Sequence, residues 1–142
     1  MSNGPTSEQF TRFFEDSERL TGEVVTLNLL KFKERADSAD GGTGEDSYRR
    51  YGAVALQKII ENGGTVVWHG SPDQVFIGDE DANDWDQVVL VAYPNRAAFM
   101  NMTADPEYQK GHGDRTGGLE RMALIPMTPS DGFAALDNGG SR

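Results

Sequence analysis

Short runs of apolar residues, separated by polar and glycine-rich stretches, predict the order of strands and helices in this chain. The run "VVTLNLLKF" begins a strand from Val24 to about Lys33. Residues 48–60 place apolar side chains at helical spacing, and the glycine pair at 63–64 ends that helix. Further strands are expected at "DQVVLVAY" and "RMALIPM", whereas "TVVWHG" and "QVFIG" are either two short strands or one bent strand.

Shorter helical segments complete the pattern. The opening "PTSEQFTRFFEDSERL" has phenylalanines at amphipathic spacing and predicts a short helix that ends near Gly22. "NRAAFMNM" predicts another, and the series Asp105, Pro106, Glu107 is a helix start signal for a piece through Tyr108. Glycines weaken the helical pattern after that point, and "GHG" around His112 indicates a loop.

After the first helix the elements follow the order strand, helix, strand, strand, helix, strand. This order predicts an α+β fold, a ferredoxin-like βαββαβ antiparallel sheet with its helices on one face. The chain divides into a helical extension at 1–22, the ferredoxin-like domain at 23–128 and a flexible tail at 129–142. In the tail, Phe133 and Leu136 could dock on the domain.

The predicted strands are apolar on both faces, although the helices of this fold cover only one. In the first strand Val25, Leu27 and Leu29 alternate with a second apolar set, Val24, Leu30 and Phe32. A second copy of the same sheet is the simplest cover for the other face. We therefore expect a homodimer that associates through the sheet faces.

Composition and charge narrow the classes of function. The 142 residues carry a formal net charge of −10, which repels nucleic acids and anionic membrane surfaces, so neither is expected as a partner. The sequence has no cysteine, which excludes disulfides, thiol catalysis and cysteine-held metals. The first residues lack the pattern of a secretory signal, and no apolar run approaches the roughly 18 residues of a membrane span. A cytoplasmic protein is expected.

A series of short motifs resembles a known family. "LNLLKF", a helix that ends in "GG", "VVWHG", "IG", "WDQVVLVAYPNRAAF", "DPEYQ", Arg115 and "LERMALI" follow one another over roughly residues 24–127. This series is similar to an uncharacterised domain-of-unknown-function family of the dimeric α/β-barrel superfamily. The resemblance implies the fold and the dimer but no reaction. The superfamily includes cofactor-free oxygenases, isomerases and haem-handling proteins, commonly with a pocket between sheet and helices.

Asn28 is the first candidate site residue because it is an amide within a strand that is otherwise apolar at its centre. An inward amide can orient a ligand carbonyl or hydroxyl in an apolar pocket. The alternative is an amide that bonds to nearby backbone and has a structural role.

Trp68 and His69 form a second candidate pair. They are adjacent on a predicted strand and therefore point to opposite faces, unless Gly70 distorts the strand. His69 could transfer a proton or bind a metal or haem iron, and so could the other histidine, His112. The alternative for His69 is a hydrogen-bonding residue of the surface or an interface.

Four further residues complete the candidate ligand pocket. Tyr48 and Tyr51 either present hydroxyls to it or belong to the core stripe of their helix. Trp85 either closes its mouth together with Asp86 or anchors a loop. Arg115 either holds an acidic ligand or pairs with Glu107 or Asp105.

Other motifs do not predict a site. "DEDANDWDQVVL" begins like a calcium loop, but Asp84 replaces its turn glycine and Leu90 its closing acid. "GHGDRTGG" lacks the preceding strand and the spacing of a dinucleotide or phosphate loop. No metal and no cofactor are therefore expected.

Two hypotheses of function follow, and the sequence does not decide between them. The first is a cofactor-independent enzyme, oxygenase-like or isomerase-like by analogy, that acts on a small hydrophobic compound. Asn28 would orient the substrate, His69 or a tyrosine would move a proton, and Trp68 or Trp85 would form a wall. The second is a non-catalytic dimer that binds or senses such a compound. A haem protein with His69 or His112 as axial ligand is a third, weaker alternative.

Overall fold

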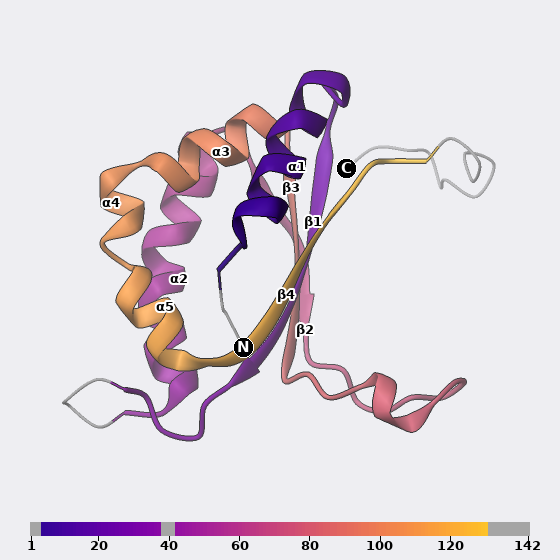
Figure 1. The fold of residues 1–142 in the computed structure, drawn as a ribbon. Coiled ribbons are helices and arrows are strands. Elements are labelled where there is room, and N and C mark those ends of the chain that lie inside the picture. Colours follow the sequence, from indigo (N-terminus) through magenta and orange to yellow (C-terminus); the bar gives the residue numbers. More distant parts are fainter. Residues whose placement is uncertain (1–3, 38–41, 131–142) are drawn as a thin grey trace.

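The computed structural model describes residues 4–37 and 42–130 and contains a four-stranded antiparallel sheet (Figure 1). The strands are β1 (Val24–Phe32), β2 (Thr65–Gly70), β3 (Gln87–Tyr93) and β4 (Leu119–Met127). Their order across the sheet is β2-β3-β1-β4. The two central strands are thus the first and third in sequence, as in a ferredoxin-like fold, and the predicted fold class is confirmed.

The helices lie on one side of this sheet and leave the other side open (Figure 1). They are α1 (Ser7–Arg19), α2 (Gly44–Glu61), α3 (Arg96–Ala104), α4 (Pro106–Gln109) and α5 (His112–Gly118). Side-chain caps fix several of their starts. Thr6 and Thr43 each form a capping box with the residue three positions later, and Asp105 accepts a hydrogen bond from the Glu107 amide ahead of Pro106.

Strand register assigns each side chain to a face of the sheet. Thr26 lies opposite Val91, and Asn28 lies opposite Val89 in β3 and Leu124 in β4. Directly opposed residues share a face, so the even-numbered residues of β1 point toward the helices. The buried core lies on that side; it comprises Val24, Ile59, Val91, Tyr93, Ala98 and Met102.

The open face of the sheet is apolar, as the sequence predicts. Leu27 in β1 lies opposite Leu90 in β3 and Ile125 in β4, and this row points away from the helices. Leu27 and Leu90 are partly exposed, and 45% of the Ile125 surface is exposed.

Two sequence predictions about local structure are wrong. "QVFIG" is not a strand: residues 71–86 form a loop that contains the 3-10 turn η1 (Glu80–Ala82) and projects on the open side of the sheet (Figure 1). Phe76 and Ile77 in this loop are 85% and 86% exposed, because no neighbouring strand pairs with them. His112 begins helix α5, which ends at Gly118, whereas the sequence indicates a loop there. A Cβ on Gly118 would lie close to the backbone of Gly44 and Tyr48 in α2, so this glycine lets the two helices approach each other.

Helix α1 precedes β1 and packs loosely on the helix layer. Within the described residues, α1 has no buried side chain; Phe13 makes an edge contact with Phe99 of α3, with ring centroids 5.4 Å apart. Phe10 and Phe14 remain about half exposed. Phe133 and Leu136 lie outside the described residues. Among the described helices, none is long and apolar enough to cross a membrane.

Candidate functional site

The four tyrosines of the sequence gather between the helices and the sheet. Tyr48 and Tyr51 come from α2, Tyr93 from β3 and Tyr108 from α4. The ring centroids of Tyr48 and Tyr51 are 5.1 Å apart, and those of Tyr51 and Tyr108 are 5.7 Å apart. The hydroxyl oxygens of Tyr51 and Tyr108 form a hydrogen bond of 2.6 Å. We call these four residues the tyrosine cluster.

Burial keeps three of these phenols protonated. Desolvation raises the pKa of Tyr48 to about 12, with a further contribution from Tyr108 and a partly opposing one from the Arg115 cation. Desolvation also raises the pKa of Tyr51, to which Tyr108 and Tyr48 add, and that of Tyr93. At neutral pH these side chains are therefore hydrogen-bond donors and acceptors but not bases.

Hydroxyl groups of the cluster retain hydrogen-bonding capacity. In the Tyr51–Tyr108 pair one hydroxyl donates and the other accepts, so the accepting hydroxyl still has a proton to donate. The Tyr48 hydroxyl makes no hydrogen bond within the described part of the chain. A ligand oxygen near these groups would find donors that are already held in place.

Arg115 of α5 belongs to the same region. Its Nη2 contacts the sulfur of Met122 in β4, and its positive charge acts on Tyr48 and Tyr51. The alternative role predicted for Arg115 was an ion pair with Asp105 or Glu107. Both carboxylates instead contact Lys58 of α2, with N–O distances of 3.2 and 3.4 Å. Arg115 is thus placed near the tyrosines rather than in that ion pair.

The Asn28 side chain points toward the helices, and its amide nitrogen forms hydrogen bonds with residues of β1 and β3. Nδ2 donates to the Thr26 carbonyl oxygen at 3.3 Å, to Thr26 Oγ1 at 3.1 Å and to the Val89 carbonyl oxygen at 3.2 Å. This is the structural role that the sequence offers as the alternative. Oδ1 makes no hydrogen bond to any described residue and remains able to accept one from a ligand.

The other sequence candidates lie away from the tyrosine cluster. His69 shares its face of the sheet with Asn28, but Val89 lies between them and His69 is exposed on the edge strand. Trp68 pairs with Leu90 and points to the open face, as predicted for neighbours in a strand. His112 is exposed at the start of α5. In the described ranges, no cluster of three or more histidine or acidic residues could hold a metal ion.

Asp86 lines a depression at the end of the sheet, and Trp85 does not. Asp86 accepts a hydrogen bond from the Phe32 amide at 2.9 Å. It lines a depression of about 400 Å³, together with Phe32, Lys33, Glu34, Thr43, Glu45, Ser71 and Gln87. Trp85 does not line it and lies under the Arg121 guanidinium, 4.3 Å from its Cζ. Since the Phe32 ring also contacts Tyr48, with centroids 5.6 Å apart, this depression borders the tyrosine cluster.

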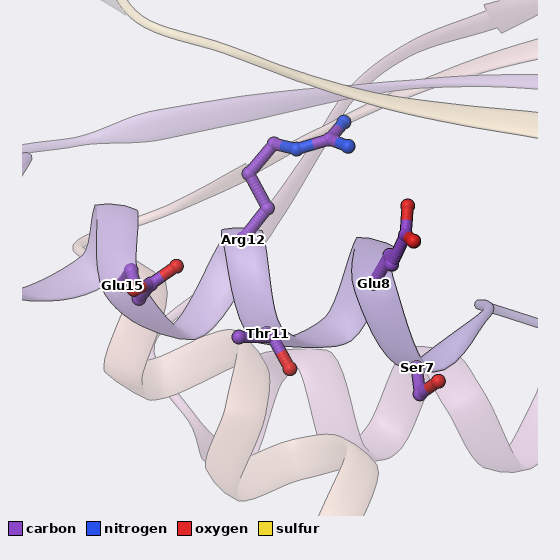
Figure 2. A pocket seen from close by; sticks show the side chains of 5 residues that line it. All are labelled: Ser7, Glu8, Thr11, Arg12 and Glu15. Carbon is purple, nitrogen blue, oxygen red and sulfur yellow. The ribbon is translucent and has the colours of Figure 1, made fainter.

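A second depression, of about 370 Å³, lies on α1 (Figure 2). Ser7, Glu8, Thr11, Arg12 and Glu15 line it, and Figure 2 shows the Arg12 and Glu8 side chains extending from the same side of the helix. All five residues are exposed, and none is aromatic. It therefore lacks the apolar walls that hold a small hydrophobic compound.

Two members of the cluster, Tyr93 and Tyr108, were not among the sequence candidates. Tyr93 is the last residue of a strand, and Tyr108 follows a helix start signal, so each has an ordinary local pattern. The even spacing of Tyr93 from Val89 and Val91 could have placed it on the helix face. The approach of Tyr108 to Tyr51 depends on how α4 packs and has no local signal.

We expect stability to fall at alkaline pH because the Tyr48 phenol is buried. Its pKa is about 12 in the folded chain against about 10 when exposed, so the stabilisation is complete below pH 10 and is lost as the pH rises toward 12. By linkage this loss amounts to about 2 kcal/mol at pH 12. Urea unfolding from pH 8 to 11.5 measures it. Tyr48→Phe should flatten the decline, and an equal decline in both proteins would contradict this assignment.

Comparisons with known proteins agree with this fold. Residues 42–127 match the model of a family described as Domain of unknown function (DUF1330). The crystal structure of a protein of unknown function from Rhodopseudomonas palustris is 33% identical, with a TM-score of 0.81; the alignment covers 91% of this chain and 97% of that one. No curated protein matches this sequence.

More distant structures share the fold alone. A dabb family protein with a ferredoxin-like fold from Mesorhizobium loti is 15% identical, with a TM-score of 0.53 over 77% of this chain and 98% of its own. A Caulobacter crescentus protein that carries the provisional name antibiotic biosynthesis monooxygenase is 9% identical, with a TM-score of 0.52 over 78% of this chain and 92% of its own. The family match spans more than half of the sequence, and the chain therefore belongs to the DUF1330 family of domains of unknown function.

Proposed function

We propose that the chain forms a homodimer through its open sheet faces and binds a small, mostly apolar compound that carries an oxygen atom beside the tyrosine cluster. The hydroxyl pair of Tyr51 and Tyr108 is the observation that supports this site best, because it offers a donor in low-dielectric surroundings. Arg115 favours a ligand oxygen that is negative or becomes so. The mostly polar depression lined by Phe32 lies next to the cluster, because the Phe32 ring contacts Tyr48.

As an enzyme, the protein would act on this compound without a bound organic cofactor. A tyrosine hydroxyl donates to the substrate oxygen, Arg115 stabilises negative charge on it, and Asn28 Oδ1 accepts from a substrate hydroxyl. These groups would bind and stabilise the enolate or phenolate form of a substrate that has already lost its proton to solvent. The Caulobacter protein's name supports an oxygenase only by fold analogy.

The second candidate function is a dimer that binds or senses the compound without changing it. The position of His69 favours this function, since the base suggested by the sequence is exposed on the edge strand β2, beside Val89. The three tyrosines with raised pKa do not replace it as a base at neutral pH. A binding protein needs only the donors and the apolar walls.

We expect Tyr51→Phe to weaken binding of 2-naphthol, an apolar phenol used as the probe, by about tenfold, because it removes one hydroxyl of the pair. Tyr108→Phe should have a similar effect. The double variant should be little worse than either single one, since the two hydroxyls act together. Calorimetric titration of the purified protein measures all four affinities.

His69→Ala is the control in the same titration and should bind 2-naphthol as the parent does. Unchanged affinity in both tyrosine variants would overturn the site. Native mass spectrometry of the purified protein would identify a retained ligand. If the parent converts this ligand and the Tyr51→Phe variant does not, the protein is an enzyme; if the parent binds it without converting it, the protein is a binding protein.

A further inference from the structure

Arg96 is a buried cation outside the tyrosine cluster. It is the first residue of α3, directly after the N-cap Asn95, and only 4% of its surface is exposed. Arginine is rarely buried to this degree unless it is paired. The position is also unfavourable for a cation, because the N-terminus of a helix carries partial positive charge.

The contacts of Arg96 do not neutralise it. Nη2 lies 3.4 Å from the hydroxyl of Thr128, which follows β4, and the Phe13 ring of α1 lies 5.8 Å from Cζ. Nε is buried and has no hydrogen-bond partner among the described residues. Within residues 4–37 and 42–130, no carboxylate forms an ion pair with Arg96.

Lys58, another buried cation of this chain, is paired with carboxylates. Its side chain is 8% exposed, and the carboxylates of Glu61, Asp105 and Glu107 surround its ammonium group at 3.2 to 3.4 Å. The sequence has 23 acidic residues against 13 lysines and arginines, so negative groups are abundant. A buried guanidinium without one therefore suggests that its negative partner comes from outside the described chain.

The free groups of Arg96 fit a carboxylate. Nε and Nη2 form one edge of the guanidinium, and this edge takes the two oxygens of a carboxylate through parallel hydrogen bonds. Its Nε is unpaired, and its Nη2 contact with Thr128 is long. The Thr128 hydroxyl can donate to one of the same carboxylate oxygens.

Aromatic rings surround Arg96, and helix α1, which covers it, is loosely held. Phe13 contacts Phe99, and Phe99 contacts Tyr93 at a centroid distance of 5.2 Å. Phe13 belongs to α1, a helix without buried side chains that lies on the helix side of the sheet (Figure 1). Displacement of α1 therefore opens a path to Arg96 at low cost.

We propose that Arg96 and Thr128 form a second binding site, which takes the carboxylate of a small aromatic acid and which α1 covers. The aromatic part of the ligand packs among the rings of Phe13 and Phe99, and the carboxylate pairs with the Nε and Nη2 edge. This site lies at the start of α3, whereas Arg115 lies on α5 at the other end of the helix layer (Figure 1). It does not depend on the ligand proposed for the tyrosine cluster.

Titration of the full chain with benzoate, followed by amide NMR, tests the site. We expect saturable shifts at residues 13, 96 and 128, and binding of benzamide at least tenfold weaker because it lacks the charge. Arg96→Met should abolish the response to benzoate, and Arg96→Lys should weaken it about tenfold because an ammonium group cannot form the two parallel bonds. Tyr51→Phe should leave it intact, which separates this site from the tyrosine cluster.

Thermal unfolding distinguishes a ligand site from a structural arginine. Without ligand, Arg96→Met should melt at the same temperature as the parent or higher, because an unpaired buried charge is replaced by an apolar side chain. A lower melting temperature combined with an unchanged benzoate response would overturn the proposal. So would the absence of saturable shifts in the parent, or equal binding of benzoate and benzamide.

Discussion

Ile125→Arg is expected to convert the proposed dimer into a monomer. Ile125 lies on the open face of β4 opposite Leu27, and a second sheet packed on this face would bury it. An arginine there would place an unpaired charge inside an apolar interface, which costs several kcal/mol and raises the dimer dissociation constant by about a thousandfold or more. Sedimentation equilibrium of the parent and the variant measures this change.

The chain provides a control with the same substitution. Ile60 on α2 is 62% exposed, but it lies on the helix side of the sheet, so Ile60→Arg should leave the dimer intact. Circular dichroism checks that both variants keep the fold. A parent that sediments as a monomer, or an Ile125→Arg variant that remains dimeric, would contradict association through the sheet faces.

The order of the elements was predictable because each is determined by a local pattern. Successive side chains of residues 24–32 point to the two faces of the sheet, and both sets are mostly apolar. Capping residues mark the starts of the helices. "QVFIG" has the same composition as a strand but forms a loop, since a strand also needs a partner with free backbone groups. Apolar composition alone therefore does not predict a strand. In this loop the apolar side chains of Phe76 and Ile77 are exposed in the single chain.

The candidate site was predictable only in part, because it depends on tertiary contacts. The helical spacing of Tyr48 and Tyr51 predicts that they share one face of their helix, and the structure places both in the tyrosine cluster. Tyr108 joins them only because α4 packs against α2. Arg96 resembles an ordinary polar residue at a helix start, and its burial follows from α1 and the segment after β4. No spacing rule in the sequence reports such contacts between distant segments.

Gly44→Ala should strongly destabilise the protein, because the first turn of α2 touches backbone on two sides. A Cβ at Gly44 would lie 2.1 Å from the carbonyl oxygen of Lys33 and 2.6 Å from that of Gly118, and neither can rotate away as a side chain can. The Gly44 amide also donates to the Lys33 carbonyl at 3.0 Å, and the Lys33 amide to that of Gly118 at 2.8 Å. We expect a loss of about 3 kcal/mol or more in the free energy of unfolding.

Gly52→Ala, in the same helix, is the matched control for that measurement. Apart from the chain neighbours and the nearby backbone of α2 itself, no described atom lies within 4 Å of a Cβ at Gly52, so this substitution should raise the free energy of unfolding by about 0.5 to 1 kcal/mol through helix propensity. Urea unfolding compares the two variants. Equal changes in the free energy of unfolding for the two variants would contradict the close approach of α2 and α5.

A destabilised but folded Gly44→Ala protein should also bind 2-naphthol more weakly, because a shift between these helices separates Tyr48 and Tyr51 from Arg115.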